Sequence, residues 1–160
     1  MAQLIVGIGD AKMSKLPVDQ IITYSLGSCL GITIYDPGSK IGGMIHLMLP
    51  DSGIESFNRT INPYKYVDTG IPLIFNQLQK MGLDRKRAVI KVAGASQLLD
   101  SKGIFNIGKK NYEALQTILA KDQLRITASD IGGTINRTMT LNIDTGRVVL
   151  KCSNQEIKDL

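Results

Sequence analysis

The stretch that decides the fold runs from Thr23 to His46 and reads TYSLGSCLGITIYDPGSKIGGMIH. Within it, the turn residues of positions 36–40 separate two apolar runs of strand length. Turn residues between two such runs predict a β-hairpin. The stretch also contains His46, the sole histidine of the chain, and Cys29, one of its two cysteines.

The register of this hairpin decides whether the thiol and the imidazole meet. An even number of loop residues places Cys29 opposite Met48. The same register places His46 opposite Gly31. Because side chains alternate with period two, Cys29 and His46 then lie on one face as diagonal neighbours, about 7–8 Å apart. An odd loop or a bulge places them on opposite faces.

Length and composition are those of one globular domain over residues 1–160, with 43% apolar side chains. The N-terminus lacks the basic region and apolar core of a signal peptide, and no apolar run approaches ~18 residues. We therefore expect a cytoplasmic protein with no direct membrane insertion. Thiols stay reduced in that compartment, so we expect no disulfide between Cys29 and Cys152.

The net charge of +5 is concentrated at residues 85–87 and 109–110. Such clusters are typical of solvated surface, and the alternative is a docking face for an acidic protein. Nucleic-acid binding is disfavoured, because the chain has five tyrosines, three phenylalanines, no tryptophan and no basic stripe interleaved with stacking rings.

Strands outside the hairpin are predicted from apolar, β-branched or aromatic runs that are bounded by breakers. Residues 12–17 are interpreted as a polar connection and residues 53–66 as a long loop. The tail from Ser153 is expected to be frayed. The predicted strands are residues 3–8, 20–24, 88–92, 124–128, 137–143 and 147–151.

Two helices are predicted. Apolar residues at helical spacing indicate the first over residues 71–81, ended by Gly82. Its Pro72 fits the first turn; alternatively, the helix begins near Asp68 and bends at Pro72. The second helix is predicted over residues 108–121, with Asn106 as its N-cap.

The order of these elements predicts an α+β fold. Strict alternation of strand and helix is absent, so a doubly wound parallel sheet is disfavoured. We expect mixed β-sheets packed together, with both helices on one outer side.

The central stretch carries groups for nucleophilic catalysis. A thiol becomes a nucleophile when it ionises, so Cys29 could attack a carbonyl carbon while His46 takes its proton and later protonates a leaving group. Backbone N–H groups of the turn through Gly27 and Ser28 could hold the oxyanion. Thr23 is the candidate for fixing the imidazole ring, because its hydroxyl can accept an N–H bond.

Each residue of this set also has a structural interpretation. A lone cysteine in a strand is usually a small buried hydrophobe, and a lone histidine is usually structural. Other motifs fail: Gly7-Ile-Gly9 lacks the third glycine of a dinucleotide site, and one histidine with two cysteines matches no zinc pattern. No cofactor or metal is expected.

Several motifs, in order along nearly the whole chain, resemble the CheD family of chemoreceptor glutamine deamidases. The match begins with Thr23-x-x-Leu26-Gly27-Ser28-Cys29, Asp36-Pro37, His46 and Leu49-Pro50-Asp51-Ser52. It continues through Lys65-Tyr66-x-Asp68, Gly94-Ala95-Ser96, Asn106-Ile107-Gly108-x-x-Asn111 and Gly132-Gly133-x-x-x-Arg137. Ser25 departs from the pattern, since the family often has Gly or Ala there.

The resemblance implies a layered α/β/β fold similar to that of toxin glutamine deamidases. It carries the family's catalytic roles onto Cys29, His46 and Thr23, with Ser25 and Arg137 at the substrate rim. The implied substrate is a glutamine side chain on a methyl-accepting chemotaxis receptor, hydrolysed through a thioester. The implied protein partner is a CheC-type phosphatase.

Two alternatives stay open at this point. The same thioester path would serve a methylesterase acting on methylated receptor glutamate. The other alternative is a non-catalytic regulator that binds a CheC-type partner. The intact set of Cys29, His46 and Thr23 favours catalysis, because a binding module has no evident need of all three.

Overall fold

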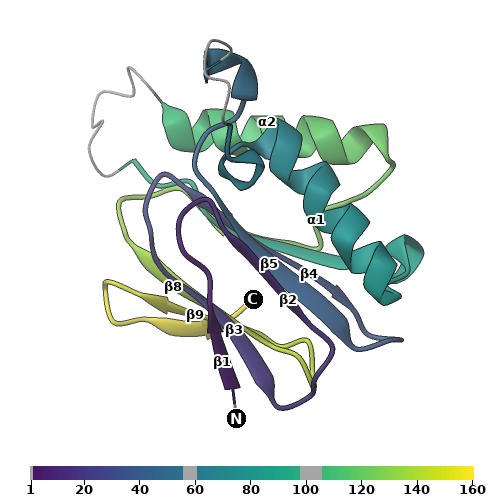
Figure 1. Cartoon of the computed structure of the whole chain (residues 1–160). Coiled ribbons are helices and arrows are strands. Elements are labelled where there is room, and N and C mark those ends of the chain that lie inside the picture. The colour runs from purple at the N-terminus through teal and green to yellow at the C-terminus, as the bar shows by residue number, and fades with distance from the viewer. Residues whose placement is uncertain (1, 56–60, 98–105) are drawn as a thin grey trace.

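The computed structural model of the chain describes residues 2–55, 61–97 and 106–160. Within these ranges, two five-stranded sheets and two α-helices form three layers (Figure 1). The first sheet has the spatial order β1 (Ala2–Ile5), β3 (Asp19–Leu26), β8 (Arg137–Asn142), β9 (Val148–Cys152) and β10 (Ile157–Asp159). The second has the order β2 (Ala11–Ser14), β5 (Ile41–Leu47), β4 (Leu30–Asp36), β6 (Val89–Gly94) and β7 (Ala128–Ile131).

Both sheets are mixed, because each contains one parallel pair among antiparallel ones. The parallel pairs are β1 with β3 and β6 with β7. Both helices, α1 (Val67–Met81) and α2 (Ile107–Lys121), lie on the same outer face of the second sheet (Figure 1). The predicted α+β class, the mixed sheets and the placement of both helices on one outer side are therefore confirmed.

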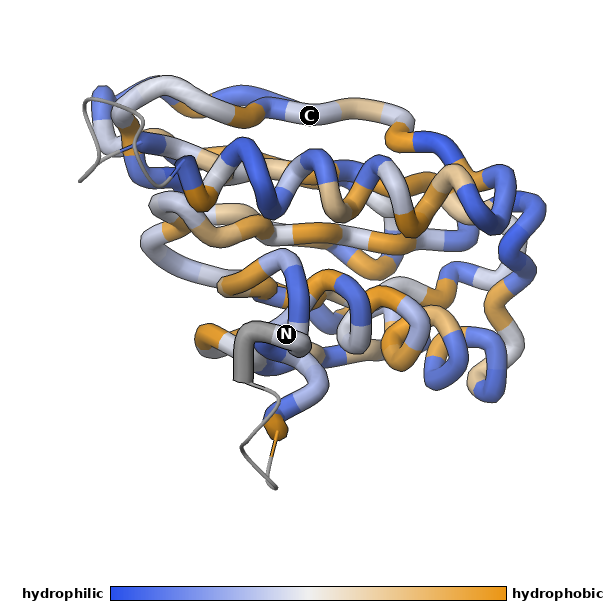
Figure 2. Tube along the Cα trace, turned by 90° about the horizontal axis from the view of Figure 1, so that it is seen from above, coloured by the Kyte–Doolittle hydropathy of each residue, from blue (hydrophilic) through white to orange (hydrophobic). Residues whose placement is uncertain are grey.

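The second sheet lies between two apolar cores, one on each of its faces. Along β4, Leu30, Ile32 and Ile34 point to the helices, whereas Tyr35 points to the first sheet. Such a strand is buried on both faces, which explains why its sequence is almost continuously apolar. Hydrophilic and hydrophobic segments alternate along the helices instead (Figure 2), as expected of elements with one buried face.

The central hairpin has the register predicted for an even loop. Asp36 pairs with Ile41, and the antiparallel pairing continues to Gly31 opposite His46 and Leu30 opposite Leu47. Cys29 is the residue immediately before β4. The hairpin therefore brings the end of β5 beside the turn that holds the cysteine.

The helices differ from expectation at their first residues. The first begins at Val67, so Pro72 lies inside it and the alternative start near Asp68 is the correct one. It ends at Gly82, whose φ of 114° suits a residue without a Cβ. Asn106 occupies the N-cap of α2, but its side chain accepts a hydrogen bond from Gln97 instead of capping the helix.

Three predictions about strands are wrong. Residues 11–14 form β2, an edge strand that pairs antiparallel with β5, although their sequence has no run of apolar residues. Residues 124–127 precede β7 instead of forming it, and their Leu124 and Ile126 pack on the helix-side core. The tail from Ser153 is not frayed, since residues 157–159 pair with β9 as β10.

Neither described helix is both long and apolar enough to cross a membrane. The thiols of Cys29 and Cys152 are both free.

The hairpin turn is anchored by the buried carboxylate of Asp36. Its two oxygens accept hydrogen bonds from the Arg87 guanidinium at 2.8 and 2.9 Å and from the backbone N–H groups of Gly38 and Asp84 at 2.9 Å. The Ser39 hydroxyl also donates, at 2.9 Å. The Arg87 hydrogen bonds are the largest cause that holds the pKa of Asp36 far below its ordinary value.

Replacing Asp36 with asparagine tests this anchor. We expect Asp36→Asn to lower the free energy of unfolding by about 2–3 kcal/mol, because Arg87 loses its charged partner. In the parent, the Asp36 contribution is complete above the unfolded carboxyl pKa of about 3.9 and is lost as the pH falls below it. Urea unfolding at neutral pH and at about pH 3 measures both effects. An acid-induced loss of stability as large in the variant as in the parent would contradict the assignment.

Candidate active site

The imidazole of His46 is fixed by a threonine from the opposite sheet. Thr23 Oγ1, on β3, lies 2.7 Å from His46 Nδ1 and donates its own proton to the Val6 carbonyl at 2.8 Å. A carbonyl cannot donate, so the hydroxyl proton is committed to Val6 and the imidazole must donate through Nδ1–H. This chain of bonds leaves the lone pair of the neutral ring on Nε2.

The lone pair on Nε2 has no protein partner. His46 is almost fully buried, and its Nε2 makes no hydrogen bond to any residue that the structure describes. Burial disfavours the charged ring and lowers the pKa of His46 to about 4. At neutral pH the ring is therefore an uncharged base with its acceptor nitrogen unused.

Cys29 lies on the same face of the sheet as His46. It packs against the apolar core between the two sheets, and the Thr23–His46 hydrogen bond joins β3 of the first sheet to β5 of the second. The side chain is half-buried. Burial raises the pKa of the thiol, while the backbone N–H of Cys29 itself acts in the opposite direction. Thiol and imidazole are thus both neutral at rest.

The turn before β4 is held through its carbonyl groups. The Ser96 N–H donates to Gly27 O at 2.9 Å, and the Ala95 N–H donates to Cys29 O at 3.0 Å. The carbonyl between them, Ser28 O, accepts from Asn111 Nδ2 at 3.2 Å. Three successive carbonyls are therefore engaged by the end of β6 and by α2.

Engaging these carbonyls also fixes the N–H groups of the turn. In a planar trans peptide the C=O and the following N–H point in opposite directions. The N–H groups of Ser28 and Cys29 consequently point away from β6 and α2. Neither makes a hydrogen bond to another residue among those described. Two free, oriented donors beside a thiol can stabilise an oxyanion.

The end of β6 has a backbone that suits this task. Gly94 and Ala95 have φ values of 116° and 55°, in the left-handed region. A Cβ on Gly94 would collide with the carbonyl oxygen of Cys29. A Cβ on Gly108 would lie 2.6 Å from Ala95 C and O, so the first turn of α2 packs directly on this backbone. Glycine at these positions allows the three segments to converge.

The remaining expected site residues fall in two different places. Ser25 is exposed, with a φ of 57°, at an irregularity where the β3–β8 register shifts. This left-handed φ gives a physical reason for glycine to suit the position. Arg137 is 3% exposed, and its guanidinium contacts Gly94 O and Ser96 Oγ behind the turn.

Reasoning from single residues did not find Asn111, which links the two chain segments beside Cys29. It is fully buried and donates to Met48 O at 3.0 Å as well as to Ser28 O. Its only signal in the sequence is its place in the motif Asn106-Ile107-Gly108-x-x-Asn111. A buried amide that joins two loops has no local pattern.

Two cavities in the described part of the chain carry fewer chemically reactive side chains than this site. One, of about 450 Å³, lies between α2 and the segment before β7 and is lined by no cysteine, histidine or acidic residue. The other, of about 250 Å³, lies between the helices, where its Arg85 and Asp122 pair with each other at 2.8 Å. No group of three or more metal-ligating side chains occurs among the described residues.

Comparison with known proteins gives one consistent result. Residues 48–152 match the family model CheD, described as CheD chemotactic sensory transduction. A protein of Solibacter usitatus named "Probable chemoreceptor glutamine deamidase CheD" is 42% identical over 160 residues, covering 100% of this chain and 94% of the relative. The "Probable chemoreceptor glutamine deamidase CheD 1" of Syntrophus aciditrophicus is 39% identical, with complete coverage of both chains.

The state of His46 can be measured directly, because a single histidine gives one set of imidazole NMR signals. We expect titration at about pH 4 and an Nδ1–H tautomer in the neutral form. The unfolded chain takes up this proton near pH ~6.5, so stability should fall as the pH drops from there toward the folded pKa.

The matched control for this titration is Thr23→Val, which removes the acceptor for Nδ1–H but keeps a similar shape. We expect it to lose the tautomer preference. A neutral Nε2–H tautomer in the parent, or a midpoint near the ordinary value, would contradict the assigned bond.

Proposed function

The chain belongs to the CheD family, and on that premise we propose that it hydrolyses glutamine side-chain amides on a methyl-accepting chemoreceptor. The observation that carries the proposal is the Thr23–His46 hydrogen bond, which leaves an uncharged, acceptor Nε2 on the face that Cys29 shares. A nucleophile, a base and a group that orients the base are the parts that acyl transfer needs.

The first half of the reaction forms a thioester. His46 Nε2 takes the proton from Sγ of Cys29 as the sulfur attacks the carboxamide carbon. The carbonyl oxygen becomes an oxyanion, which the N–H groups of Ser28 and Cys29 stabilise. The imidazolium then protonates the amide nitrogen, the C–N bond breaks and ammonia leaves. Thr23 keeps the ring oriented throughout by accepting from Nδ1–H.

The second half returns the enzyme to its resting state. His46 Nε2 removes a proton from water as the water oxygen attacks the thioester carbon. The tetrahedral intermediate collapses, the C–S bond breaks and the sulfur recovers its proton from the imidazolium. The net change is glutamine plus water to glutamate plus ammonia.

Exposed apolar side chains beside the site support a protein as the substrate. Ile8, Tyr24 and Met48 are 65%, 48% and 39% exposed. Tyr24 follows Thr23 in the chain, and Ile8 precedes Gly9, whose N–H donates to His46 O at 2.9 Å. Exposed apolar groups around a site are typical of a protein-binding surface. We therefore assign the glutamine to a folded receptor segment and not to a free amino acid.

A CheC-type phosphatase is the second partner in this proposal. Such a protein would bind over the same apolar side chains and compete with the receptor. The two alternative functions, methylesterase and non-catalytic regulator, predict different experimental results. Methylesterase activity would release methanol from methylated receptor, and a purely regulatory protein would bind the phosphatase without changing any receptor glutamine.

Removing the nucleophile is the decisive test. We expect Cys29→Ala to abolish ammonia release from a receptor fragment, because no other described side chain of the site can form the thioester. The amide-to-acid mass change in receptor peptides, followed by mass spectrometry, measures this. The matched control is Cys152→Ala, which removes the other, buried thiol and should remain active. Full activity of Cys29→Ala would end the proposal.

The two imidazole-related residues should differ in effect. We expect His46→Ala to lower kcat by about 10³-fold or more, because both proton transfers are lost. Thr23→Val should lower kcat by about 100-fold or less, since the ring remains but is no longer oriented. Steady-state ammonia release by folded variants measures both. Equal activity of Thr23→Val and the parent would remove Thr23 from the mechanism.

A further inference from the structure

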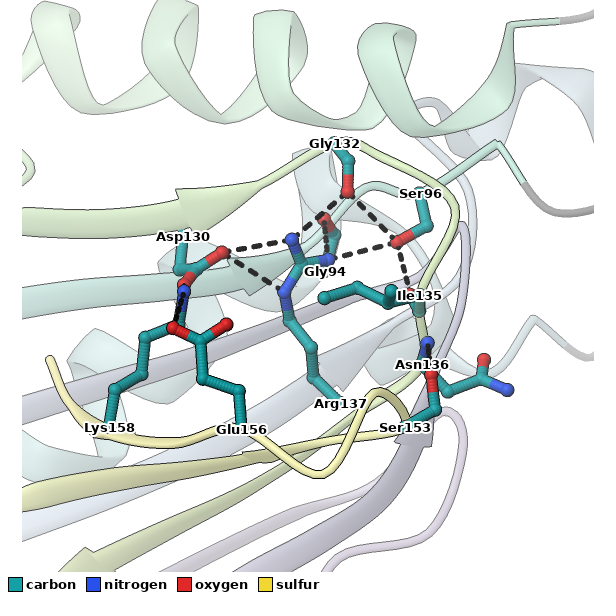
Figure 3. Close-up of polar contacts among 10 residues, drawn as sticks. All are labelled: Gly94, Ser96, Asp130, Gly132, Ile135, Asn136, Arg137, Ser153, Glu156 and Lys158. Atoms are coloured by element: carbon teal, nitrogen blue, oxygen red, sulfur yellow. Dashed lines mark hydrogen bonds and ion pairs between the residues drawn. The ribbon is translucent and has the colours of Figure 1, made fainter.

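Arg137, at the start of β8, lies at the centre of a buried polar network (Figure 3). Its Nε and Nη2 donate to Asp130 Oδ1 at 3.2 and 2.9 Å. Nη1 donates to Gly94 O at 3.1 Å and to Ser96 Oγ at 2.9 Å. Nη2 also donates to Gly132 O at 3.0 Å. Five hydrogen bonds occupy the five N–H donors of the guanidinium.

This arrangement excludes a direct contact between Arg137 and a substrate. The side chain is 4% exposed and has no donor left to offer. Its charge is compensated by Asp130, which Lys158 also contacts (Figure 3). Arg137 therefore acts on the protein itself.

The segment that Arg137 contacts is the one that orients the cysteine turn. Gly94 O and Ser96 Oγ flank Ala95, and the N–H groups of Ala95 and Ser96 donate to Cys29 O and Gly27 O. Gly94 and Ala95 are both left-handed, a conformation that needs support in a residue with a Cβ. One planar guanidinium fixes both ends of that strained segment.

We propose that Arg137 is a positioning residue for the Cys29 site: it locks the left-handed turn at Gly94–Ser96, which holds the carbonyls of the cysteine turn and so aims the N–H groups of Ser28 and Cys29. This inference rests on the proposed deamidation. The inference adds to the proposed mechanism a residue, Arg137, that contacts neither the substrate nor the reacting atoms.

The chemistry of the network requires arginine. A lysine ammonium has three donors at one point, whereas the guanidinium presents five donors in a fixed plane. Lysine at this position could neutralise Asp130 but could not also reach Gly94 O, Ser96 Oγ and Gly132 O. Charge and geometry can therefore be separated by one substitution.

The test is Arg137→Lys, assayed per folded molecule well below its unfolding temperature. We expect kcat for receptor deamidation to fall about tenfold to 100-fold, because the N–H groups of Ser28 and Cys29 are no longer held in the orientation that binds the oxyanion. We expect KM to stay within about twofold of the parent value. We also expect the pH midpoint for iodoacetamide alkylation of Cys29 to rise, because the Cys29 N–H that lowers the thiol pKa becomes less ordered. Mass spectrometry of the Cys29 peptide separates this reaction from that of Cys152.

A second variant keeps the test valid if Arg137→Lys does not fold. Ser96→Ala removes the Oγ that accepts from Arg137 at 2.9 Å and donates to Ile135 O at 2.7 Å, but keeps the N–H bond to Gly27 O. We expect a fall in kcat of about fivefold to tenfold, again with little change in KM. The matched control is Lys158→Met, which removes the outer partner of Asp130 without touching Gly94 or Ser96. We expect it to retain the parent's kcat, KM and alkylation profile.

The outcomes separate the two proposals. Lower unfolding temperature with unchanged kcat and unchanged Cys29 alkylation in Arg137→Lys and Ser96→Ala would make Arg137 merely structural and overturn the inference. An equal loss of kcat in Lys158→Met would also overturn it. If the parent itself does not deamidate receptor, the proposed function fails, while the alkylation profiles still decide whether Arg137 positions the Cys29 turn.

Discussion

The site depends on one constraint: the peptide groups before β4 are held by their carbonyl oxygens from a single side. Ser96 N–H, Asn111 Nδ2 and Ala95 N–H engage the carbonyls of Gly27, Ser28 and Cys29 in succession. Because each peptide group is planar and trans, holding its C=O on one side directs the following N–H to the other side. The N–H groups of Ser28 and Cys29 therefore lie on the side away from these donors. The same segments explain why glycine occupies positions 94 and 108, where a Cβ would separate backbones that must touch.

The sequence predicted those features whose physical basis is local. Turn residues at positions 36–40 and the apolar runs on either side predicted the hairpin, while its register stayed conditional on an even loop. The structure has the even-loop register, with Asp36 opposite Ile41 and Gly31 opposite His46. Thr23 was chosen because its hydroxyl can accept an N–H bond, and the structure brings that hydroxyl to 2.7 Å from the imidazole. Because side chains alternate strictly along a strand, an even loop is sufficient to place Cys29 and His46 on one face.

Features that depend on distant partners were not predictable. β2 has no apolar run, and it becomes a strand because β5 offers it an edge to pair with. Arg137 resembles any arginine at the start of a strand, and only the convergence of Gly94, Ser96 and Asp130 buries it. The basic residue expected at a substrate rim therefore lies behind the site. The charge of an arginine does not tell whether it lies at a substrate rim or is buried behind a site. What decides this for Arg137 is the set of carbonyl and carboxylate oxygens that surround its guanidinium.

Two buried polar atoms of the candidate site lack, within the part of the chain that the structure describes, the hydrogen bond that buried polar groups usually make. His46 Nε2 and Asn111 Oδ1 make no hydrogen bond to any described residue, and a buried polar atom without a partner costs about 1–3 kcal/mol. For Asn111 the cause is geometric, because both acceptors near its amide are carbonyls and its NH₂ group must face them. For His46 the cause is the Thr23 bond, which commits the proton to Nδ1. In both cases the hydrogen bond that fixes the side chain is made, and the polar atom on its other side is left without a partner among the described residues.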